Sequence, residues 1–416
     1  MDVAASHSSA AGRRKMSITS RSLSKHFRAG YRFSEFCIFI LRRNANNLKT
    51  ILLTGATGFL GGSLAASLLA RGAKVIAVSR NDSNAQRTKQ SVLEAAHGFQ
   101  LAFPHEAFQR LTVIDAGNGP LADALDAELL RDVEVIWHCA AEMAYSTDKL
   151  AQAFRTNVCD TADLYRRVAE SAPGCVRFYY VSTAYTAGML GGETLEALHV
   201  GNPCVNSYQV TKWAAEQALS VLHTQGKLPV SIFRPTIVVG HSRTGWARRN
   251  GFGVYMFVDA IDAVRKAGFA DVTLDLASDA RPDLIPVDRL TDDMVGLTLR
   301  QDQGRDFEIF QCAGGQHLST HQIISAIGLV AGVDVNYGTP QKALDRRIDR
   351  AVAANRPFAN TDWTFSRARL DAALDRTTSP TTPVSEPLLR HLVAWYCTDT
   401  NSDDERMKAG VGEALQ

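Results

Sequence analysis

The apolar and polar positions of residues 49–240 alternate between two patterns. Short runs rich in Val, Ile and Leu predict buried strands at residues 50–53, 74–78, 111–114, 133–137, 176–181 and 230–233. The stretches between them carry apolar residues at helical spacing and predict helices at residues 59–71, 85–96, 121–130, 149–171 and 207–223. Strands that alternate with helices in this way form a parallel, doubly wound sheet, so the sequence predicts an α/β protein with a Rossmann-like domain.

This alternation stops after residue 240. Residues 241–275 are rich in Gly and Arg and predict a loop followed by a helix at 254–267. Segments 307–335 and 340–397 predict helices with short strands in a smaller C-terminal lobe. We therefore expect four segments: a basic extension at 1–47, the Rossmann-like domain at 48–240, the lobe at 241–398 (with the chain returning to the first domain near 284–310), and a polar tail at 399–416.

A glycine-rich turn directly follows the first predicted strand. Its residues are Gly55, Thr57, Gly58, Phe59, Leu60 and Gly61. The first glycine allows a tight turn, the second lets a phosphate approach the backbone, and the third lets the following helix pack close to the strand. The N-terminus of that helix also attracts anions through its free N–H groups. A strand, a glycine turn and a helix in this order predict a site for a dinucleotide pyrophosphate.

A second motif lies far downstream, on the predicted helix 207–223. Tyr208 and Lys212 are four residues apart, so their side chains share one helix face. An ammonium close to a phenol favours phenolate and lowers the pKa of the phenol toward neutral pH, which suits proton transfer beside a nicotinamide. An ordinary amphipathic helix would explain this pair by itself. It does not explain the pair together with the glycine turn in an alternating strand–helix chain.

The charge of the chain is nearly balanced, at +2, which argues against nucleic acid as the main partner. The balance hides an asymmetry, because residues 1–49 hold ten Lys and Arg against Asp2 and Glu35 and so carry +8, leaving −6 on the remainder. Seven cysteines without a C-x-x-C pair indicate reduced, mostly buried thiols in a cytoplasmic protein. No run of about 18 apolar residues occurs, so no membrane span is predicted.

The basic segment 1–47 has three interpretations. Its Ser-, Arg- and Ala-rich composition fits a disordered extension, or a start that lies further along, with Met16 as the alternative first residue. A basic segment poor in acids also fits an organelle transit peptide or an anchor on an anionic surface. The apolar stretch 36–41 is too short for a signal-peptide core and has no small-residue cleavage site after it.

Three motifs together resemble the extended short-chain dehydrogenase/reductase superfamily over roughly residues 49–300. They are Thr-Gly-Ala-Thr-Gly-Phe-Leu-Gly from residue 54, Val-Ser-Thr-Ala-Tyr from residue 181, and Tyr208-x-x-x-Lys212. Further stretches are similar to its thioester-reductase branch, which includes fatty acyl-CoA reductases of the male sterility type and the terminal reductase domains of peptide synthetases. These stretches are residues 138–142, 156–158, 180–185, 211–216, 233–240 and 285–288.

The resemblance implies roles for four side chains. Tyr208 would protonate the substrate oxygen, Lys212 would lower the pKa of the phenol and hold the nicotinamide ribose, and Thr183 would hydrogen-bond the substrate carbonyl. Ser182 is the alternative to Thr183, although strand alternation directs it to the other face. Asn157, on the predicted long helix, would organise a proton path or brace the sheet.

The resemblance also implies how the cofactor is held. Members that prefer NAD(H) carry a carboxylate at the end of the second strand, whereas this strand ends in Ser79 and Arg80 with no acid before Asp82. The guanidinium of Arg80 suits a 2′-phosphate, so NADP(H) is expected, with NAD(H) as the alternative; a merely solvated Arg80 is the other interpretation of that side chain. The remaining expected contacts are Asp115, Ala116, Ala140, Ala141, Pro235 and Ile237.

The function implied by the resemblance is NADPH-dependent reduction of an acyl thioester to an aldehyde or an alcohol. A stand-alone chain would take its acyl group from coenzyme A or from a separate carrier protein, bound under the C-terminal lobe. An NAD(P)-dependent epimerase, dehydratase or hydroxysteroid-type dehydrogenase is the alternative on the same scaffold. A nucleotide-binding scaffold with a vestigial site is the non-enzymatic alternative, and the presence of Thr183, Tyr208, Lys212 and the glycine turn argues against it.

Other polar residues have simpler interpretations. His317 and His321 are four apart, but no third ligand is evident nearby, so no metal site is predicted. His138, at the end of a predicted strand, is expected to pack in the interior. Three arginines of the 241–251 loop could bind the phosphates of coenzyme A or of a phosphopantetheine arm, although a solvated loop is the simpler interpretation. These arginines are Arg243, Arg248 and Arg249.

Overall fold

The structure is a computed structural model that describes residues 49–249, 251–276, 279–300, 304–376 and 383–398. The chain from Lys49 onward forms one compact unit. The expected extension at 1–47, with its three interpretations, and the expected polar tail at 399–416 lie outside the described residues.

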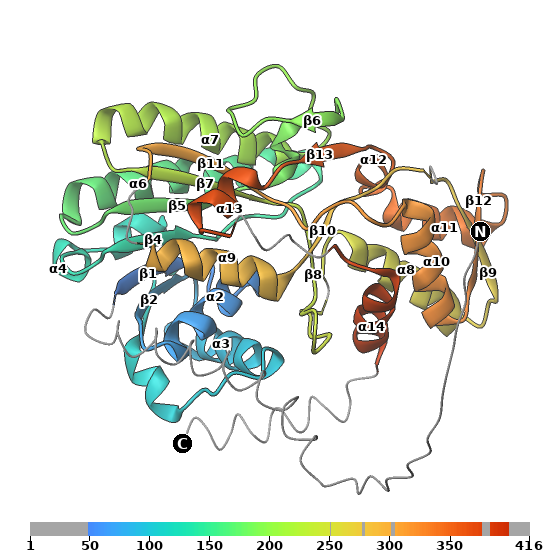
Figure 1. Ribbon diagram of the computed structural model, residues 1–416, viewed down its shortest axis with the longest axis horizontal. Helices are drawn as coiled ribbons and strands as arrows, with labels where there is room; N and C mark the ends of the chain where they lie inside the picture. Colours follow the sequence, from blue (N-terminus) through green and yellow to red (C-terminus); the bar gives the residue numbers. More distant parts are fainter. Residues whose placement is uncertain (1–48, 250, 277–278, 301–303, 377–382, 399–416) are drawn as a thin grey trace, which may run out of the picture. The chain divides into compact units, whose positions relative to one another are not determined.

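A seven-stranded parallel sheet lies at the centre of this unit, in the strand order β11-β7-β5-β4-β1-β2-β3 (Figure 1). The strands are β1 Thr50–Thr54, β2 Lys74–Ser79, β3 Leu111–Asp115, β4 Val135–His138, β5 Arg177–Val181, β7 Val230–Pro235 and β11 Phe307–Cys312. The strand order reverses between β1 and β4, and doubly wound sheets bind ligands at the carboxyl ends of the strands at such a point. The predicted α/β class and Rossmann-like parallel sheet are confirmed.

Helices cover both faces of the sheet because alternate strand residues enter two separate cores. Leu53 and Trp137 pack with the helices of one face, and Leu52 and Ile136 pack with those of the other. The helices of the first face are α2 Phe59–Ala70, α3 Gln86–Gly98 and α9 Val287–Leu299. Those of the second face are α4 Ala127–Leu130, α5 Leu150–Phe154, α6 Asp160–Ser171 and α7 Ser207–Gly226.

Three predicted segments differ from the structure. The predicted helix 121–130 is divided into a 3₁₀ turn, η2 (Leu121–Ala124), and α4, because Asp126 caps α4 by accepting a hydrogen bond from Leu129 N. The predicted helix 149–171 contains a widened π-turn, η4 (Arg155–Cys159), between α5 and α6. The start of the segment 307–335, expected in the lobe apart from the return of the chain near 284–310, is β11, and β11 pairs with β7 at the edge of the sheet.

The remaining elements gather mainly beside the sheet, to the right in Figure 1. Their strands form three two-stranded pairs: β6 Gly192–Thr194 with β13 Trp363–Phe365, β8 Ile237–Val239 with β10 Leu284–Pro286, and β9 Asp271–Leu274 with β12 Asp334–Tyr337. Their helices are α8 Val254–Lys266, α10 Thr320–Ala331, α11 Ala343–Val352, α12 Arg356–Ala359, α13 Ala368–Ala373 and α14 Glu386–Cys397. Helices α8, α10 and α14 enclose a third core that includes Ile261, Ile324 and Leu392.

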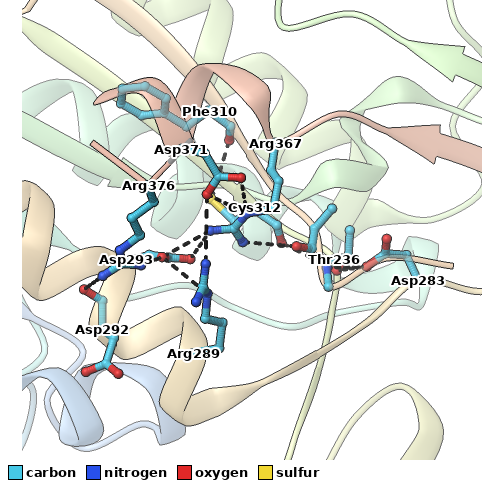
Figure 2. A network of polar contacts seen from close by, with 12 residues as sticks. Thr236, Asp283, Arg289, Asp292, Asp293, Phe310, Cys312, Arg367, Asp371 and Arg376 are labelled. Carbon is cyan, nitrogen blue, oxygen red and sulfur yellow. Dashed lines mark hydrogen bonds and ion pairs between the residues drawn. The ribbon is translucent and has the colours of Figure 1, made fainter. Parts of the chain in front are cut away.

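A cluster of buried charges ties the C-terminal chain to α9 (Figure 2). Asp293 of α9 is fully buried and accepts two hydrogen bonds of 3.1 Å from Nη2 of Arg367. Arg376 also donates to Asp293, and Arg289 forms a longer ion pair of 3.7 Å with it. Arg367 is held in turn by Asp371 of α13 at 3.0 Å. These contacts fasten the chain after β13 onto the helix layer of the sheet.

Two further findings bear on the expectations from composition. None of the described helices is long and apolar enough to cross a membrane. The six cysteines in the described part of the chain are all unpaired. Cys312 is fully buried, four others are half-buried, and Cys159 is exposed on the π-turn η4, so the expectation of mostly buried thiols is met in part.

Candidate active site

The glycine turn folds tightly against the segment that follows β4. Gly55 has a φ of +76°, and a Cβ on it would lie 2.7 Å from the backbone nitrogen of Ala140. A Cβ on Gly61 would lie 2.2 Å from the carbonyl oxygen of Gly55. Both approaches exclude a side chain. Gly58 is the N-cap of α2 and makes no side-chain capping bond, and its neighbours Thr57, Phe59 and Leu60 are half-buried, so the helix N-terminus can receive an anion.

His138 links this strand end to the π-turn by hydrogen bonds. Its Nδ1 lies 2.7 Å from Oγ1 of Thr54, and its Nε2 lies 2.9 Å from Oγ1 of Thr161. Because the Thr161 hydroxyl donates to the carbonyl of Asn157, it accepts from Nε2–H, and Nδ1 accepts from Thr54. Burial lowers the pKa of His138 to about 3, so the imidazole stays neutral. The expectation that His138 packs in the interior is confirmed, and its side chain also makes these two hydrogen bonds.

Asn157 connects the loop after β4 to the helix that carries Tyr208. Its Oδ1 accepts from the backbone nitrogen of Glu142 at 2.7 Å, and its Nδ2 donates to Oγ1 of Thr211 at 2.9 Å. It lies in the π-turn η4, a type of distortion that is common at functional sites. Through these contacts Asn157 links the loop after β4 to α7, an arrangement that is compatible with the bracing role among the two that the resemblance implied. The loop that it braces holds Ala140 and Ala141, and Ala140 N donates to Thr54 Oγ1 at 3.2 Å.

Lys212 is buried beneath β5. Its Nζ donates to the carbonyl of Val181 at 2.6 Å and lies 4.6 Å from the ring centre of Tyr180. One turn earlier on α7, Gln209 donates to the carbonyl of Tyr185 at 2.8 Å. The end of β5 therefore lies directly against the helix segment of Tyr208 and Lys212. Burial lowers the pKa of Lys212 to about 8.

The pKa of the Tyr208 phenol is shifted in the opposite direction from the predicted one. Burial raises the pKa of Tyr208, and the neighbouring Tyr145, whose ring centre is 6.3 Å away, raises it further. The predicted lowering by Lys212 is wrong for this structure, since desolvation dominates and the ammonium is hydrogen-bonded to a β5 carbonyl. A phenol with a raised pKa stays protonated at neutral pH and can donate a proton.

Ser182 and Thr183 point to opposite sides at the end of β5, as strand alternation predicts. The Ser182 hydroxyl donates at 2.5 Å to Glu216, which forms a fully buried ion pair with Arg234. Ser182 is thereby occupied inside the protein. Thr183 Oγ1 accepts from the backbone nitrogen of Tyr185 at 3.4 Å and caps the short turn η5 (Ala184–Ala187). Within the described residues no acceptor takes the proton of Thr183, so it can donate to a substrate oxygen.

The ends of β2 and β3 show which groups could meet the adenosine ribose. Ser79 is turned inward, with its hydroxyl 2.8 Å from Oγ1 of Thr88. Asp82 accepts from the backbone nitrogens of Arg87 and Thr88, both at 2.9 Å, so its carboxylate is engaged at the start of α3. Arg80 forms an ion pair with Asp160 of α6 and keeps a buried Nε with no hydrogen-bond partner among the described residues.

Other groups at the same strand ends complete this region. Asp115 accepts from Gly117 N at 2.9 Å, which lowers the pKa of its carboxyl, and Ala116 N donates to Ser79 O. The exposed guanidinium of Arg87 donates to Arg80 O at 3.0 Å. A second arginine therefore lies at the turn after β2. Sequence reasoning missed it because residue 87 reaches back to residue 80 only when α3 folds beside β2.

The segment 241–249, which we call the strap, lies on the glycine turn and is not a solvated loop as predicted. Its Trp246 ring is 5.3 Å from the ring of Phe59 and fills the space next to Gly98. Arg248 Nη1 donates to Thr57 O at 2.5 Å and to Ser91 Oγ at 3.0 Å. The strap thus holds the guanidinium of Arg248 beside the glycine turn. Of the other two arginines, Arg243 is exposed, and Arg249 lies over the rings of Trp395 and Tyr396.

Asp283, which the sequence analysis did not single out, fixes the turn after β7. Thr236, between Pro235 and Ile237, donates to Asp283 at 2.6 Å, and Asp283 also accepts from Gly314 N at 2.8 Å (Figure 2). Burial raises the pKa of Asp283. This anchor holds Ile237 at the wall of a cavity.

The cavity lies beside the phenol of Tyr208 and has a volume of about 80 Å³. Its wall joins residues of the Rossmann-like part to residues of the C-terminal elements. Aliphatic and aromatic side chains form most of the wall, together with three phenols and the polar side chains of Gln209, Thr320 and Asn355. The lining residues include Tyr145, Tyr185, Tyr208, Ile237, Phe257, Ile324 and Phe358.

No group of three His, Cys, Asp or Glu side chains that could hold a metal ion occurs in the described part of the chain.

Comparisons with known proteins bear on the rest of the site. A family model described as male sterility protein matches residues 53–294, more than half of the chain. An isonitrile lipopeptide synthase of Streptomyces coeruleorubidus is 31% identical over 271 residues, which are 62% of this chain and 17% of that protein. A carboxylic acid reductase of Segniliparus rugosus is 28% identical over 224 residues, 49% of this chain and 19% of that protein. The chain thus spans less than a fifth of the length of these two relatives.

Solved structures share the fold. The terminal R domain from the myxalamid PKS-NRPS biosynthetic pathway superposes with a TM-score of 0.66 at 20% identity, over 84% of this chain and 90% of that one. A UDP-glucose 4-epimerase from Bifidobacterium longum, in complex with NAD+ and UDP, superposes with a TM-score of 0.60 at 17% identity, over 85% of this chain and 99% of that one. At these identities the likeness establishes the fold alone.

Proposed function

Because the chain belongs to the male sterility protein family of NAD(P)-binding reductases, within the extended short-chain dehydrogenase/reductase superfamily, we propose that it reduces an acyl thioester with NADPH. The acyl group comes from coenzyme A or from a separate carrier protein, and the product is an aldehyde or, after a second reduction, an alcohol. Residues 48–240 bind the cofactor in this proposal, and residues 241–398 cover the acyl group.

One observation carries the choice of substrate: the cavity beside Tyr208 is mainly apolar. Ile237, Phe257, Ile324 and Phe358 line it. Recognition of a sugar nucleotide needs many hydrogen bonds to ring hydroxyls, whereas an acyl chain needs an apolar wall with few polar groups. The cavity therefore favours the thioester over the epimerase or dehydratase alternative.

The residues present fit a bound NADPH. Gly55 and Gly61 leave no room for a Cβ at the turn, and Arg248 supplies a cation beside it. Arg80 and Arg87 lie at the turn after β2, where the first acid, Asp82, is engaged by backbone N–H groups and cannot hold a ribose diol. This set favours the 2′-phosphate of NADPH over the free hydroxyl of NADH.

Each side chain has a separate role in the proposed reaction. NADPH, when bound, supplies a hydride to the carbonyl carbon of the thioester. Thr183 donates a hydrogen bond to the carbonyl oxygen, and Tyr208, kept protonated by its raised pKa, gives that oxygen a proton as negative charge develops on it. Lys212 positions the β5 end against α7 through its bond to Val181 O. The hemithioacetal so formed releases a thiol and leaves an aldehyde.

The direct test mixes the purified full-length chain with NADPH and a panel of acyl-CoA and carrier-bound thioesters, following nicotinamide absorbance and free thiol together. One NADPH consumed per thiol released is expected for an aldehyde product, and two for an alcohol. Turnover of UDP-sugars or alcohols without thiol release from any acyl donor would move the protein to the epimerase or dehydrogenase alternative.

Arg80→Ala is expected to raise the Kd for NADPH by about 10–100-fold and to leave the Kd for NADH nearly unchanged, because only NADPH carries the 2′-phosphate. Fluorescence titration with both nucleotides measures the two constants. The control is Asp160→Asn, which releases Arg80 from its ion pair and should keep or improve NADPH binding. If Arg80→Ala weakens the binding of NADPH and NADH equally, Arg80 contacts a part of the molecule that both nucleotides share.

Arg248→Gln is expected to raise the Kd values for NADPH and NADH alike, by about 10–100-fold, because both nucleotides carry the pyrophosphate. The same titration measures this effect. Arg243→Gln, on an exposed arginine of the same strap, should change neither constant. Unchanged affinities in Arg248→Gln, with a lower unfolding temperature, would leave Arg248 with a purely structural role in holding the strap to Thr57.

A further inference from the structure

The hydroxyl of Tyr185 is buried in the wall of the cavity without a partner. The side chain is only 8% exposed, and Tyr185 lines the cavity together with Tyr145 and Tyr208. Among the residues that the structure describes, no group hydrogen-bonds this hydroxyl. Buried hydroxyls in native proteins nearly always have a partner, so an unpaired one on a side chain that lines a cavity points to a partner on the ligand.

Other buried tyrosines of this chain follow the usual rule. Tyr165 and Tyr179 each donate to a backbone carbonyl at 3.0 Å, and the hydroxyl of Tyr255 accepts from Gly240 N at 2.7 Å. Tyr180 also lacks a partner, but it lies beneath the ammonium of Lys212 and does not line the cavity. Among the described tyrosines, Tyr185 is thus the one that is buried, lines the cavity and has a hydroxyl without a hydrogen-bond partner.

The ring of Tyr185 is held rigidly, so its hydroxyl points in a fixed direction. Three aromatic rings pack edge-on against it, with centre-to-centre distances of 5.0 Å for Phe358, 5.1 Å for Trp363 and 6.0 Å for Phe365. Gln209, next to Tyr208 on α7, holds the backbone carbonyl of Tyr185 at 2.8 Å. A fixed hydroxyl loses little conformational entropy when it binds a ligand, which suits selective recognition.

We propose that Tyr185 hydrogen-bonds an oxygen atom on the acyl chain of the substrate, a hydroxyl, an oxo group or an amide carbonyl. The substrate is then an oxygen-substituted acyl thioester and not an unsubstituted fatty acyl thioester. This inference rests on the proposed function, because it assigns the cavity to the acyl group. The thiol-bearing arm must extend out to coenzyme A or to a carrier. Because Tyr185 is buried, we assign its hydroxyl to the acyl chain and not to this arm.

The selectivity follows from the cost of leaving Tyr185 unpaired. An unsubstituted chain would leave the buried hydroxyl without a hydrogen bond, whereas an oxygenated chain would give it one. An oxygen at the matching position along the chain removes that cost. A site built to hydrogen-bond a substrate group rejects the analogue that lacks it more strongly than an apolar wall rejects an extra methylene.

The test compares the CoA thioesters of hexanoic, 3-hydroxyhexanoic, 3-oxohexanoic and 5-hydroxyhexanoic acid with the wild-type chain and with Tyr185→Phe. We expect the wild type to prefer at least one oxygenated thioester over hexanoyl-CoA by about 10–100-fold in kcat/KM. Tyr185→Phe should abolish this preference and still release thiol from the thioesters, since the ring and its aromatic contacts remain.

Tyr179→Phe is the matched control, because it removes a buried hydroxyl that bonds Leu297 O outside the cavity and should leave the preference intact. Unfolding temperatures report whether each variant is folded. Thiol release by the wild type with no preference for oxygenated chains would overturn this inference alone, as would an equal loss on every thioester in Tyr185→Phe. An absence of thiol release from any thioester would overturn the proposed function as well.

Discussion

Replacing Tyr208 with Phe is expected to lower thioester reduction by about 10²–10⁴-fold, the range typical for the loss of a positioned proton donor. The substrate oxygen would then have no group to protonate it as the thioester carbonyl is reduced. The loss should fall on kcat, because Phe keeps the ring against Tyr145 and the wall of the cavity. NADPH affinity should change little, since the glycine turn and the arginines near it are untouched.

Single-turnover measurements of thiol release and nicotinamide absorbance separate this loss from a change in binding. Tyr337→Phe is the matched control, because it removes a phenol whose bond to His321 O lies outside the cavity, and it should retain wild-type turnover. Wild-type turnover by Tyr208→Phe would show that Tyr208 does not donate the proton. Another group would then be the donor, and the neighbouring phenol of Tyr145 would be the next candidate.

The second large effect concerns stability. Glu216→Gln is expected to lower the free energy of unfolding by about 3–5 kcal/mol, because it leaves Arg234 charged and unpaired in the interior. Both side chains are fully buried, with Nη2 of Arg234 2.6 Å from Oε2 of Glu216 and Nε 2.9 Å from Oε1. Glu216 also accepts from Ser182, so the change should loosen the end of β5 beside Thr183.

Urea denaturation measures this effect, and an exposed pair on α6 provides the control. Asp163 lies 2.9 Å from Arg166, with both side chains about half exposed, so Asp163→Asn should cost less than about 1 kcal/mol. A double variant, Glu216→Gln with Arg234→Met, should regain part of the loss because it removes the unpaired charge. A cost for Glu216→Gln as small as that of Asp163→Asn would show that the buried pair contributes little.

Local spacing along the chain predicted the fold class and the positions of the main candidate groups. Strand periodicity separates Ser182 from Thr183, and helical periodicity puts Tyr208 and Lys212 on one face, because these relations depend only on backbone geometry within a single element. The glycine turn is equally local, since Gly55, Gly58 and Gly61 act within one turn between β1 and α2. Such features can be identified before any tertiary contact is known.

Contacts between distant segments could not be predicted in this way. Arg248 reaches Thr57 across 191 positions, and Asp283 fixes Thr236 across 47, because the strap and the β8–β10 pair fold back onto the sheet. The sign of the pKa shift of Tyr208 also depended on the tertiary structure. The four-residue spacing to Lys212 predicted a lower pKa, but burial, which depends on everything packed around the phenol, raised it.

The sequence by itself determined the Rossmann-like domain, the glycine turn and the Tyr208–Lys212 helix face, since each arises from short-range backbone and side-chain geometry. Only the tertiary structure decided that the strap is ordered, that β11 completes the sheet, and that an apolar cavity with the unpaired hydroxyl of Tyr185 lies beside Tyr208. A cavity is enclosed by side chains from many elements at once. Its shape and polarity therefore follow from packing, which no local pattern in the chain specifies.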